Sequence, residues 1–206
     1  MKFTKKLMLI ALLCINYNVS ADIILDGKIN EQAWDTAKAF STFVVTSPDT
    51  GEQPSVNTQV KLISNQRGLY FAFKNQQPIK SRSRKYSAKD QHTSADFNSI
   101  VIDFSGQGDT LYEFVVTLGN GSMDGVYTRG NQYDGDWEGA WDFKISEDEK
   151  NWIAEIFIPW AIAPYYLDQN SDLSKINLFF SRYFIEKGEA YSFPDTSAAK
   201  ANFMQS

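Results

Sequence analysis

The chain has 206 residues, a formal net charge of −5 and a hydrophobic content of 43%. A chain of this length can bury a core large enough to fold as one domain without cross-links. The acidic balance argues against a nucleic-acid partner, because the only basic cluster is the short run at residues 80–85. We interpret that run as a solvated loop.

The first 21 residues have the pattern of a secretory signal peptide. Three lysines precede an apolar run at residues 7–15, and small residues at 19–21 offer a cleavage site. We therefore expect an exported, periplasmic or extracellular protein whose single domain spans residues 22–206. Removal of the signal takes away three lysines and Cys14, the only cysteine, so the formal charge moves from −5 to −8. No later segment is apolar enough for a membrane span.

The mature chain opens with a short strand, a turn at Asp26-Gly27 and a helix, according to the pattern of its residues. Asn30 is the expected N-cap of this helix, with Glu31 in the first turn. Trp34 then lies on the helix, and we expect it to anchor the helix to a sheet.

The rest of the chain is a series of alternating runs separated by turn residues, which predicts an all-β sandwich or barrel. The turn residues favour hairpins, and hence antiparallel strands. In the run at 152–158 the even positions form one fully apolar face, and Pro159 ends the strand because it lacks an amide donor. Residues 160–163 are expected to add one helical turn. The expected strands are residues 56–64, 69–75, 97–104, 111–118, 123–128, 140–146, 152–158 and 176–184.

Several of these segments together resemble family 9 carbohydrate-binding modules. The resemblance covers almost all of the mature chain, and it is closest to the family-9-like domain at the N-terminus of some larger bacterial envelope proteins, where a pair like Trp137 and Trp141 also occurs. It implies an antiparallel β-sandwich of jelly-roll type, related to the DOMON group, and a non-catalytic role in binding a sugar or polysaccharide end. The segments that carry it are residues 25–34, 60–63, 68–73, 96–103 and 154–159.

The sugar site of that family is not kept in this sequence. The family holds a terminal sugar between two tryptophans, helped by a glutamate and an arginine. The resemblance puts the first tryptophan near Thr93, the glutamate near Ser99 and the arginine near Val115. The second tryptophan falls near Ala199 or Lys200. None of the four residue types is present, so a sugar site would have to be built from other residues.

The stretch from residue 127 to 138 is the main candidate for such a relocated site. Glycines and carboxylates surround Trp137, which predicts an exposed indole, whereas the alternation of the next strand assigns Trp141 to the buried face. Aromatic rings cover the apolar face of a sugar, and Arg and Asp pair with neighbouring hydroxyls. The alternative is a solvated acidic loop with Trp137 folded back over the sandwich edge. The expected ligand-binding residues are Tyr127, Arg129, Tyr133, Asp136 and Trp137.

The same loop offers carboxylates for a calcium ion. Asp134, Asp136 and Glu138 stand at alternate positions, like the start of a helix-loop-helix calcium loop, but the twelfth position is Ile145, inside a strand. That motif is therefore excluded. A looser calcium site using the three carboxylates stays open, and the family resemblance implies structural calcium.

The sequence contains fewer of the residues that other kinds of site, catalytic or haem-binding, would require. A single histidine and no mature cysteine argue against a catalytic zinc site or a serine triad. Haem, which DOMON relatives bind, would need Met123 with His92 or a lysine as its axial ligands. A methionine at the start of a strand usually packs against other side chains instead. Asp96 and Asp103 point to opposite faces, so they do not form a glycosidase pair, and we expect Asp96 to tie a loop to backbone amides. A cell-envelope protein partner with no small ligand is the remaining alternative.

Overall fold

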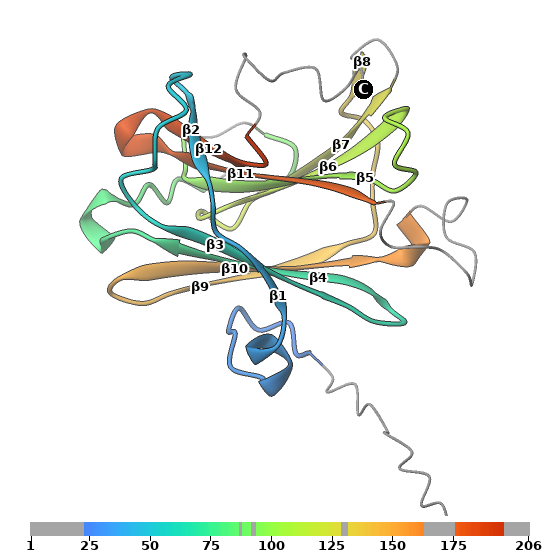
Figure 1. Cartoon of the computed structure of the whole chain (residues 1–206), viewed down its shortest axis with the longest axis horizontal. Helices are drawn as coiled ribbons and strands as arrows, with labels where there is room; N and C mark the ends of the chain where they lie inside the picture. Colours follow the sequence, from blue (N-terminus) through green and yellow to red (C-terminus); the bar gives the residue numbers. More distant parts are fainter. Residues whose placement is uncertain (1–22, 87, 92–93, 129–131, 163–175, 196–206) are drawn as a thin grey trace, which may run out of the picture.

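The structure is a computed structural model that describes residues 23–86, 88–91, 94–128, 132–162 and 176–195. Two antiparallel sheets pack face to face, as the sequence predicts (Figure 1). One has five strands in the order β1-β3-β4-β10-β9, and the other has seven in the order β2-β12-β11-β5-β6-β7-β8. The strands are β1 (Lys38–Phe40), β2 (Val44–Ser47), β3 (Thr58–Ser64), β4 (Gly68–Gln76), β5 (Phe97–Asp103), β6 (Thr110–Thr117), β7 (Ser122–Thr128), β8 (Gln132–Asp134), β9 (Asp142–Glu147), β10 (Asn151–Pro159), β11 (Asn177–Phe184) and β12 (Glu189–Phe193).

All eight strands expected from alternation are present, with ends within two residues of the prediction. The four strands that were not predicted are β1, β2, β8 and β12. They are three to five residues long, too short for an alternating pattern to stand out from a loop. The expected turn after Pro159 is the 3₁₀ helix η3 (Trp160–Ile162). Two further 3₁₀ turns are η2 (Ile79–Ser81) and η5 (Ile185–Lys187).

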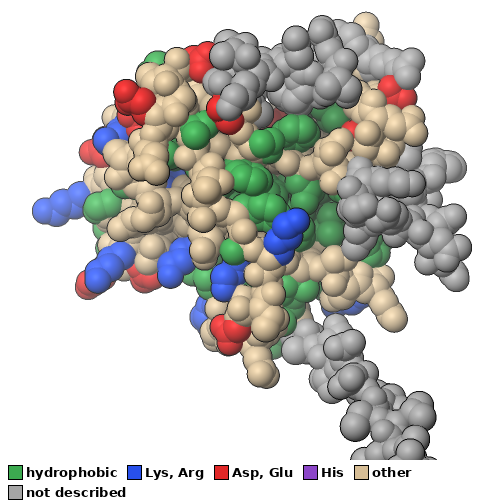
Figure 2. All heavy atoms as spheres, viewed as in Figure 1, with side chains coloured by type: hydrophobic (Ala, Val, Ile, Leu, Met, Phe, Trp, Pro, Cys, Tyr) green, Lys and Arg blue, Asp and Glu red, His purple; other side chains and the backbone are tan. Residues whose placement is uncertain are grey.

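The main core lies between the two sheets. Side chains alternate across each strand, so every second residue of β10 points inward, and these four are fully buried as predicted: Trp152, Ala154, Ile156 and Ile158. They meet Phe71 and Phe73 of β4 and residues of the facing sheet such as Ile100, Phe114 and Phe180. Figure 2, drawn from the same side as Figure 1, shows hydrophobic side chains gathered between the two layers.

The N-terminal segment covers the outer face of the five-stranded sheet (Figure 1). Trp34 is fully buried against Tyr70 and Ala72 on that face of β4, which confirms its anchoring role. Two expectations for this segment are wrong: residues 23–25 form no strand, and the helix is only the 3₁₀ turn η1 (Gln32–Asp35), preceded by Glu31 rather than capped at Asn30. Burial of the Trp34 side chain, rather than helix length or a side-chain cap, holds this segment in place.

Glu155 fastens the N-terminal segment to β10. It is fully buried on the outer face, and its Oε2 accepts hydrogen bonds from the amides of Asp26 at 3.0 Å and Gly27 at 2.9 Å. Gly27 has a φ of +82°, so the expected turn is formed there. Oε1 has no hydrogen-bond partner. Burial raises the pKa of the Glu155 carboxyl to about 7, although the two amide hydrogen bonds oppose the shift.

The run at residues 80–85 is solvated only in part: Lys80, Arg84 and Lys85 are exposed as expected, whereas Arg82 is not. Arg82 is buried: its Nε and Nη2 donate to the carbonyl of Gln77, and its Nη1 donates to Glu147. Arg84 also binds Glu147. The two arginines therefore tie this run to the end of β9, which spacing in the sequence could not reveal.

A set of buried polar groups lies at the same end of the sandwich. Asp96 is fully buried and accepts hydrogen bonds from the amides of Ser83 and Ile185, which confirms the prediction that it ties loops to the sheet. Gln77 bonds both to Asp96 and to Arg182, which is itself fully buried. Within the described residues no helix has the length and apolar character needed to span a bilayer.

Candidate functional site

The outer face of the seven-stranded sheet carries the positions of the family's glutamate and arginine. Ser99 on β5 and Val115 on β6 are direct cross-strand partners, so the two positions named by the resemblance are neighbours in space. Neither has the charged side chain of the family. Glu113, two residues before Val115 on β6, points to the same face and brings a carboxylate to Ser99.

Glu113 joins two hydroxyl groups on this face. Its Oε1 accepts a hydrogen bond from Ser99 Oγ at 3.1 Å, and its Oε2 accepts one from Tyr127 Oη at 3.2 Å. Burial and the adjacent Glu113 carboxylate raise the pKa of Tyr127 well above its ordinary value. The phenol therefore keeps its proton and acts as the donor. Glu113 could not be singled out from the sequence, because a glutamate on the polar side of an alternating strand looks like an ordinary solvent-facing residue.

Tyr127 and Tyr133 form the aromatic part of the site. They are cross-strand partners on β7 and β8, with ring centroids 4.7 Å apart and a tilt of 46°. Tyr133 lies across Gly125, where a Cβ atom would come within 2.5 Å of the phenol oxygen. Half of Tyr133 is exposed, so one side of its ring is open to a ligand. Of the four expected ligand-binding residues that the structure describes, Tyr127 and Tyr133 are thus brought together.

Trp137 lies differently from the exposed indole that its loop suggested. It is half-buried and makes edge contacts with Tyr112 at 5.2 Å and Phe114 at 6.0 Å between ring centroids. The rings of Tyr112 and Phe114 point inward from β6, whereas Tyr127 and Tyr133 lie on the outer face. Trp137 therefore folds back over the end of the sandwich and away from Tyr127 and Tyr133. Trp141 also packs on Phe114 and on the core, although it precedes β9 and is only half-buried. Gly139 permits this arrangement, since a Cβ there would meet the Trp137 ring at 2.6 Å.

Asp136 does not join the tyrosine site. Asp136 is exposed, and its amide donates to Asp134 in a local turn. Arg129 lies outside the described residues, as do His92, Thr93, Ala199 and Lys200. Met123, the methionine considered for haem, is half-buried on β7, opposite Val115.

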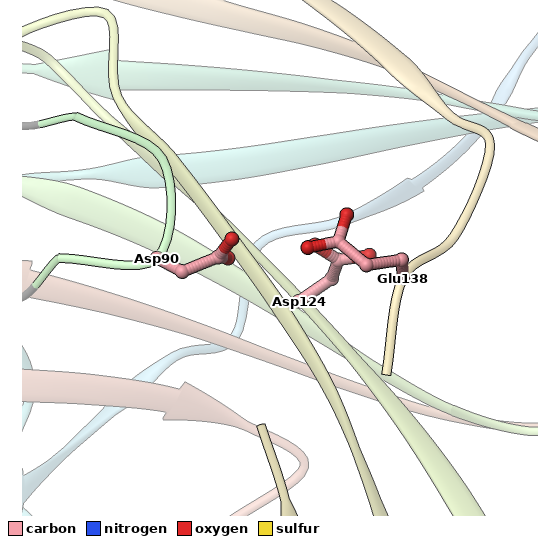
Figure 3. A group of neighbouring side chains, drawn as sticks. All are labelled: Asp90, Asp124 and Glu138. Carbon is pink, nitrogen blue, oxygen red and sulfur yellow. The ribbon is translucent and has the colours of Figure 1, made fainter. Parts of the chain in front are cut away.

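Glu138 lies beside two carboxylates other than those expected from the sequence. One oxygen from each of Asp90, Asp124 and Glu138 lies within 4.8 Å of the others. Figure 3 shows these side chains pointing toward one another from three separate segments. Asp134 and Asp136, the other two carboxylates expected to bind calcium, are not part of this group in the part of the chain that the structure describes. One feature of the sequence could have indicated this group: Asp124 is an aspartate at an inward-facing position of a strand, where an apolar residue is usual.

Comparison with known proteins supports the fold. No protein-family model matches the sequence, and no curated protein matches it. Two solved structures of a family 9 carbohydrate-binding module from Caldicellulosiruptor kristjanssonii are similar, one in complex with cellotriose (TM-score 0.54, 89% of this chain and 84% of that chain covered) and one in complex with glucose (TM-score 0.57, 89% and 85%). A putative carbohydrate-binding protein from Bacteroides uniformis ATCC 8492 has a TM-score of 0.59 and coverage of 77% and 78%. Each is 12% identical to this chain. The chain therefore has the fold of family 9 carbohydrate-binding modules.

Proposed function

We propose that this protein binds carbohydrate without catalysis, on the outer face of its seven-stranded sheet. The observation that carries the proposal is the half-exposed Tyr133 ring beside the Glu113 carboxylate. A fold shared with a module solved with cellotriose and glucose supports the ligand class. The export expected from the N-terminal residues fits an extracellular or periplasmic sugar.

The chemistry of the site suits a pyranose ring. The open side of Tyr133 can cover the apolar face of a sugar, as aromatic residues do in binding sites. An ionised carboxylate such as Glu113 has about four lone-pair sites, so it can accept several hydrogen bonds at once. A sugar hydroxyl that donates to Glu113 forms a charge-assisted hydrogen bond, which is stronger than a neutral one.

The described carboxylates favour binding over hydrolysis. Asp96 and Asp103 are buried and accept hydrogen bonds from backbone amides, so neither is placed to act on a substrate. Glu113 and the half-exposed ring of Tyr133 lie on the same face of one sheet. This arrangement is typical of recognition of a sugar without cleavage.

Calorimetric titration with glucose and cello-oligosaccharides tests the proposal. Tyr133→Ala should abolish binding or lower it at least tenfold, since stacking on one aromatic ring is lost. Ile79→Ala is a matched control, because Ile79 is exposed to a similar extent, 47% against 50%, on η2. Trp137→Phe decides whether the indole contacts the ligand and is expected to leave affinity unchanged. If a wide oligosaccharide panel gives no heat with the wild-type protein, the envelope-partner alternative is favoured instead.

A further inference from the structure

A pocket of about 240 Å³ opens at the edge of the sandwich beside β2. The chain crosses between the two sheets twice at this edge. Residues 41–43 lead from β1 in the five-stranded sheet to β2 in the seven-stranded sheet, and residues 48–57 lead back to β3 (Figure 1). Both crossings contribute to the lining of the pocket, which therefore lies between them.

The backbone around the pocket is held by hydrogen bonds. The Val45 amide donates to the Glu52 carbonyl and the Gly51 amide donates to the Val45 carbonyl, each at 2.9 Å. Phe43, which lines the pocket, is buried and packs against Phe193 with 6.2 Å between ring centroids. The walls are thus positioned before any ligand arrives.

Four polar side chains of the lining have hydrogen-bonding groups available to a ligand. Asn57 is one of them: its backbone amide and carbonyl are both bonded to Gln76, but its side-chain amide points to no protein partner among the described residues. All four are exposed, and within the part of the chain that the structure describes none of their side chains makes a hydrogen bond: Ser41, Thr42, Gln53 and Asn57.

The chemistry of the lining favours a neutral ligand. Among the described residues that line the pocket none is charged, and Val44 and Val56 add partly exposed apolar surface to the hydroxyl and amide groups. Thr58 is buried in the lining, and its Oγ1 accepts a hydrogen bond from the buried Arg182 at 2.9 Å. An ionic ligand would find no opposite charge there, whereas a ligand with both hydroxyl groups and apolar faces matches both parts of the lining.

We propose that this pocket is a second carbohydrate site, which holds one neutral sugar ring. Its volume of about 240 Å³ is roughly eight times the ~30 Å³ that a water molecule occupies in the liquid. It is smaller than the ~300–1,000 Å³ of pockets for drug-sized ligands, which fits one ring rather than a chain. The pocket shares no residue with the site at Tyr133, so this inference goes beyond the proposed function and does not require it.

The two sites lie at opposite edges of one sheet. β2 and β8 are the edge strands of the seven-stranded sheet (Figure 1). Six strand spacings of about 4.8 Å put the pocket roughly 29 Å from Tyr133 along the sheet. One molecule with both sites can contact two points of a polysaccharide, which raises the overall affinity above that of either site.

NMR titration of the ¹⁵N-labelled protein with glucose, galactose, mannose, xylose and cellotriose tests the two sites separately. Saturable shifts are expected at the amides of Thr42, Gln53 and Asn57, with dissociation constants in the millimolar range, and Tyr133→Ala should leave them unchanged. Shifts confined to the surroundings of Tyr127 and Tyr133 would overturn the second site and retain the proposed function. Shifts confined to the pocket would do the reverse, and a protein with no shifts would contradict both.

Variants show whether the lining side chains hold the sugar. Gln53→Ala combined with Asn57→Ala removes two hydrogen-bonding groups and should weaken binding in the pocket about tenfold or more. Neither side chain bonds to a described residue, so the fold and the Tyr133 site should be retained. Asn30→Ala combined with Gln32→Ala is the matched control, because it removes the same two amides from exposed positions of the N-terminal segment. Unchanged affinity at Thr42 in the first double variant would overturn the proposal.

Discussion

The hydroxyl of Ser99 and the carboxylate of Glu113 are joined by a hydrogen bond of 3.1 Å across two neighbouring strands. The family resemblance places a ligand-binding glutamate at position 99, where this chain has a serine. The carboxylate instead comes from β6, and it arrives beside the same position. A polar group of the right kind is therefore present on the face where the resemblance expects one.

Glu113→Gln should weaken oligosaccharide binding by about ten- to a hundredfold, because hydrogen bonds to charged groups contribute about 1.5–3 kcal/mol. The amide keeps the size of the side chain, so the fold and melting temperature should change little. Glu186→Gln, at an exposed position in η5, is the control for a loss of one negative charge. Equal affinities for the two variants would rule out a ligand contact by Glu113.

Gly125→Ala should disrupt the site without removing any of its side chains. The added methyl group would lie within 2.5–2.7 Å of Tyr133 ring and hydroxyl atoms, so the ring must move off the sheet. Sugar affinity should fall about as far as in Tyr133→Ala, while the core stays intact. A double variant, Gly125→Ala with Tyr133→Ala, should bind no more weakly than Tyr133→Ala alone. Additive losses would show that Gly125 acts by another route.

Glu155 makes stability depend on pH. Its pKa rises from an ordinary value of 4.5 to about 7 in the folded protein, so between these values the folded state binds more protons than the unfolded state. The free energy of unfolding should therefore fall as pH rises from 4.5 to 7, by on the order of 3 kcal/mol. Denaturant unfolding at pH 5 and pH 8 measures this difference. Glu155→Gln should remove most of the difference, and an unchanged pH profile in that variant would assign the effect to other groups.

Trp34→Ala should lower the free energy of unfolding by about 3–5 kcal/mol, the usual cost of removing a large buried aromatic side chain. The loss arises on the outer face of the five-stranded sheet, far from Tyr133 across the sandwich. Sugar affinity of the folded variant should therefore match the wild type. Chemical unfolding and calorimetry on the same preparation measure both quantities, with Trp34→Phe expected to show a smaller loss of stability.

The sandwich could be predicted from the sequence because its long strands are buried on at least one face. Period-two alternation and turn residues then fix both the strands and their sides, as for Trp152 to Ile158. The site could be predicted only in part. Tyr127 and Tyr133 could be proposed from the sequence, but the position of the Tyr133 ring over Gly125, eight residues away, could not.

The errors concern residues whose position is decided by tertiary contacts. The glycines and carboxylates around Trp137 predict that its indole is exposed. In the structure the indole instead packs against the rings of Phe114 and Tyr112. Likewise Asp90 is separated from Asp124 and Glu138 by strands and turns, so their meeting cannot be seen from spacing. In both cases the sequence shows which residue types are available and the packing decides which of them meet.

The two broad sides of this sandwich are unequal because residues 23–37 occupy one of them. If the proposed site is correct, a ligand that is part of an immobile polymer engages the opposite side, at Glu113 and Tyr133. The protein would then always attach in the same orientation, with Trp34 and the N-terminal segment turned away from the polymer surface. The N-terminal segment thus contributes to stability and, in this arrangement, also sets which way the bound molecule faces.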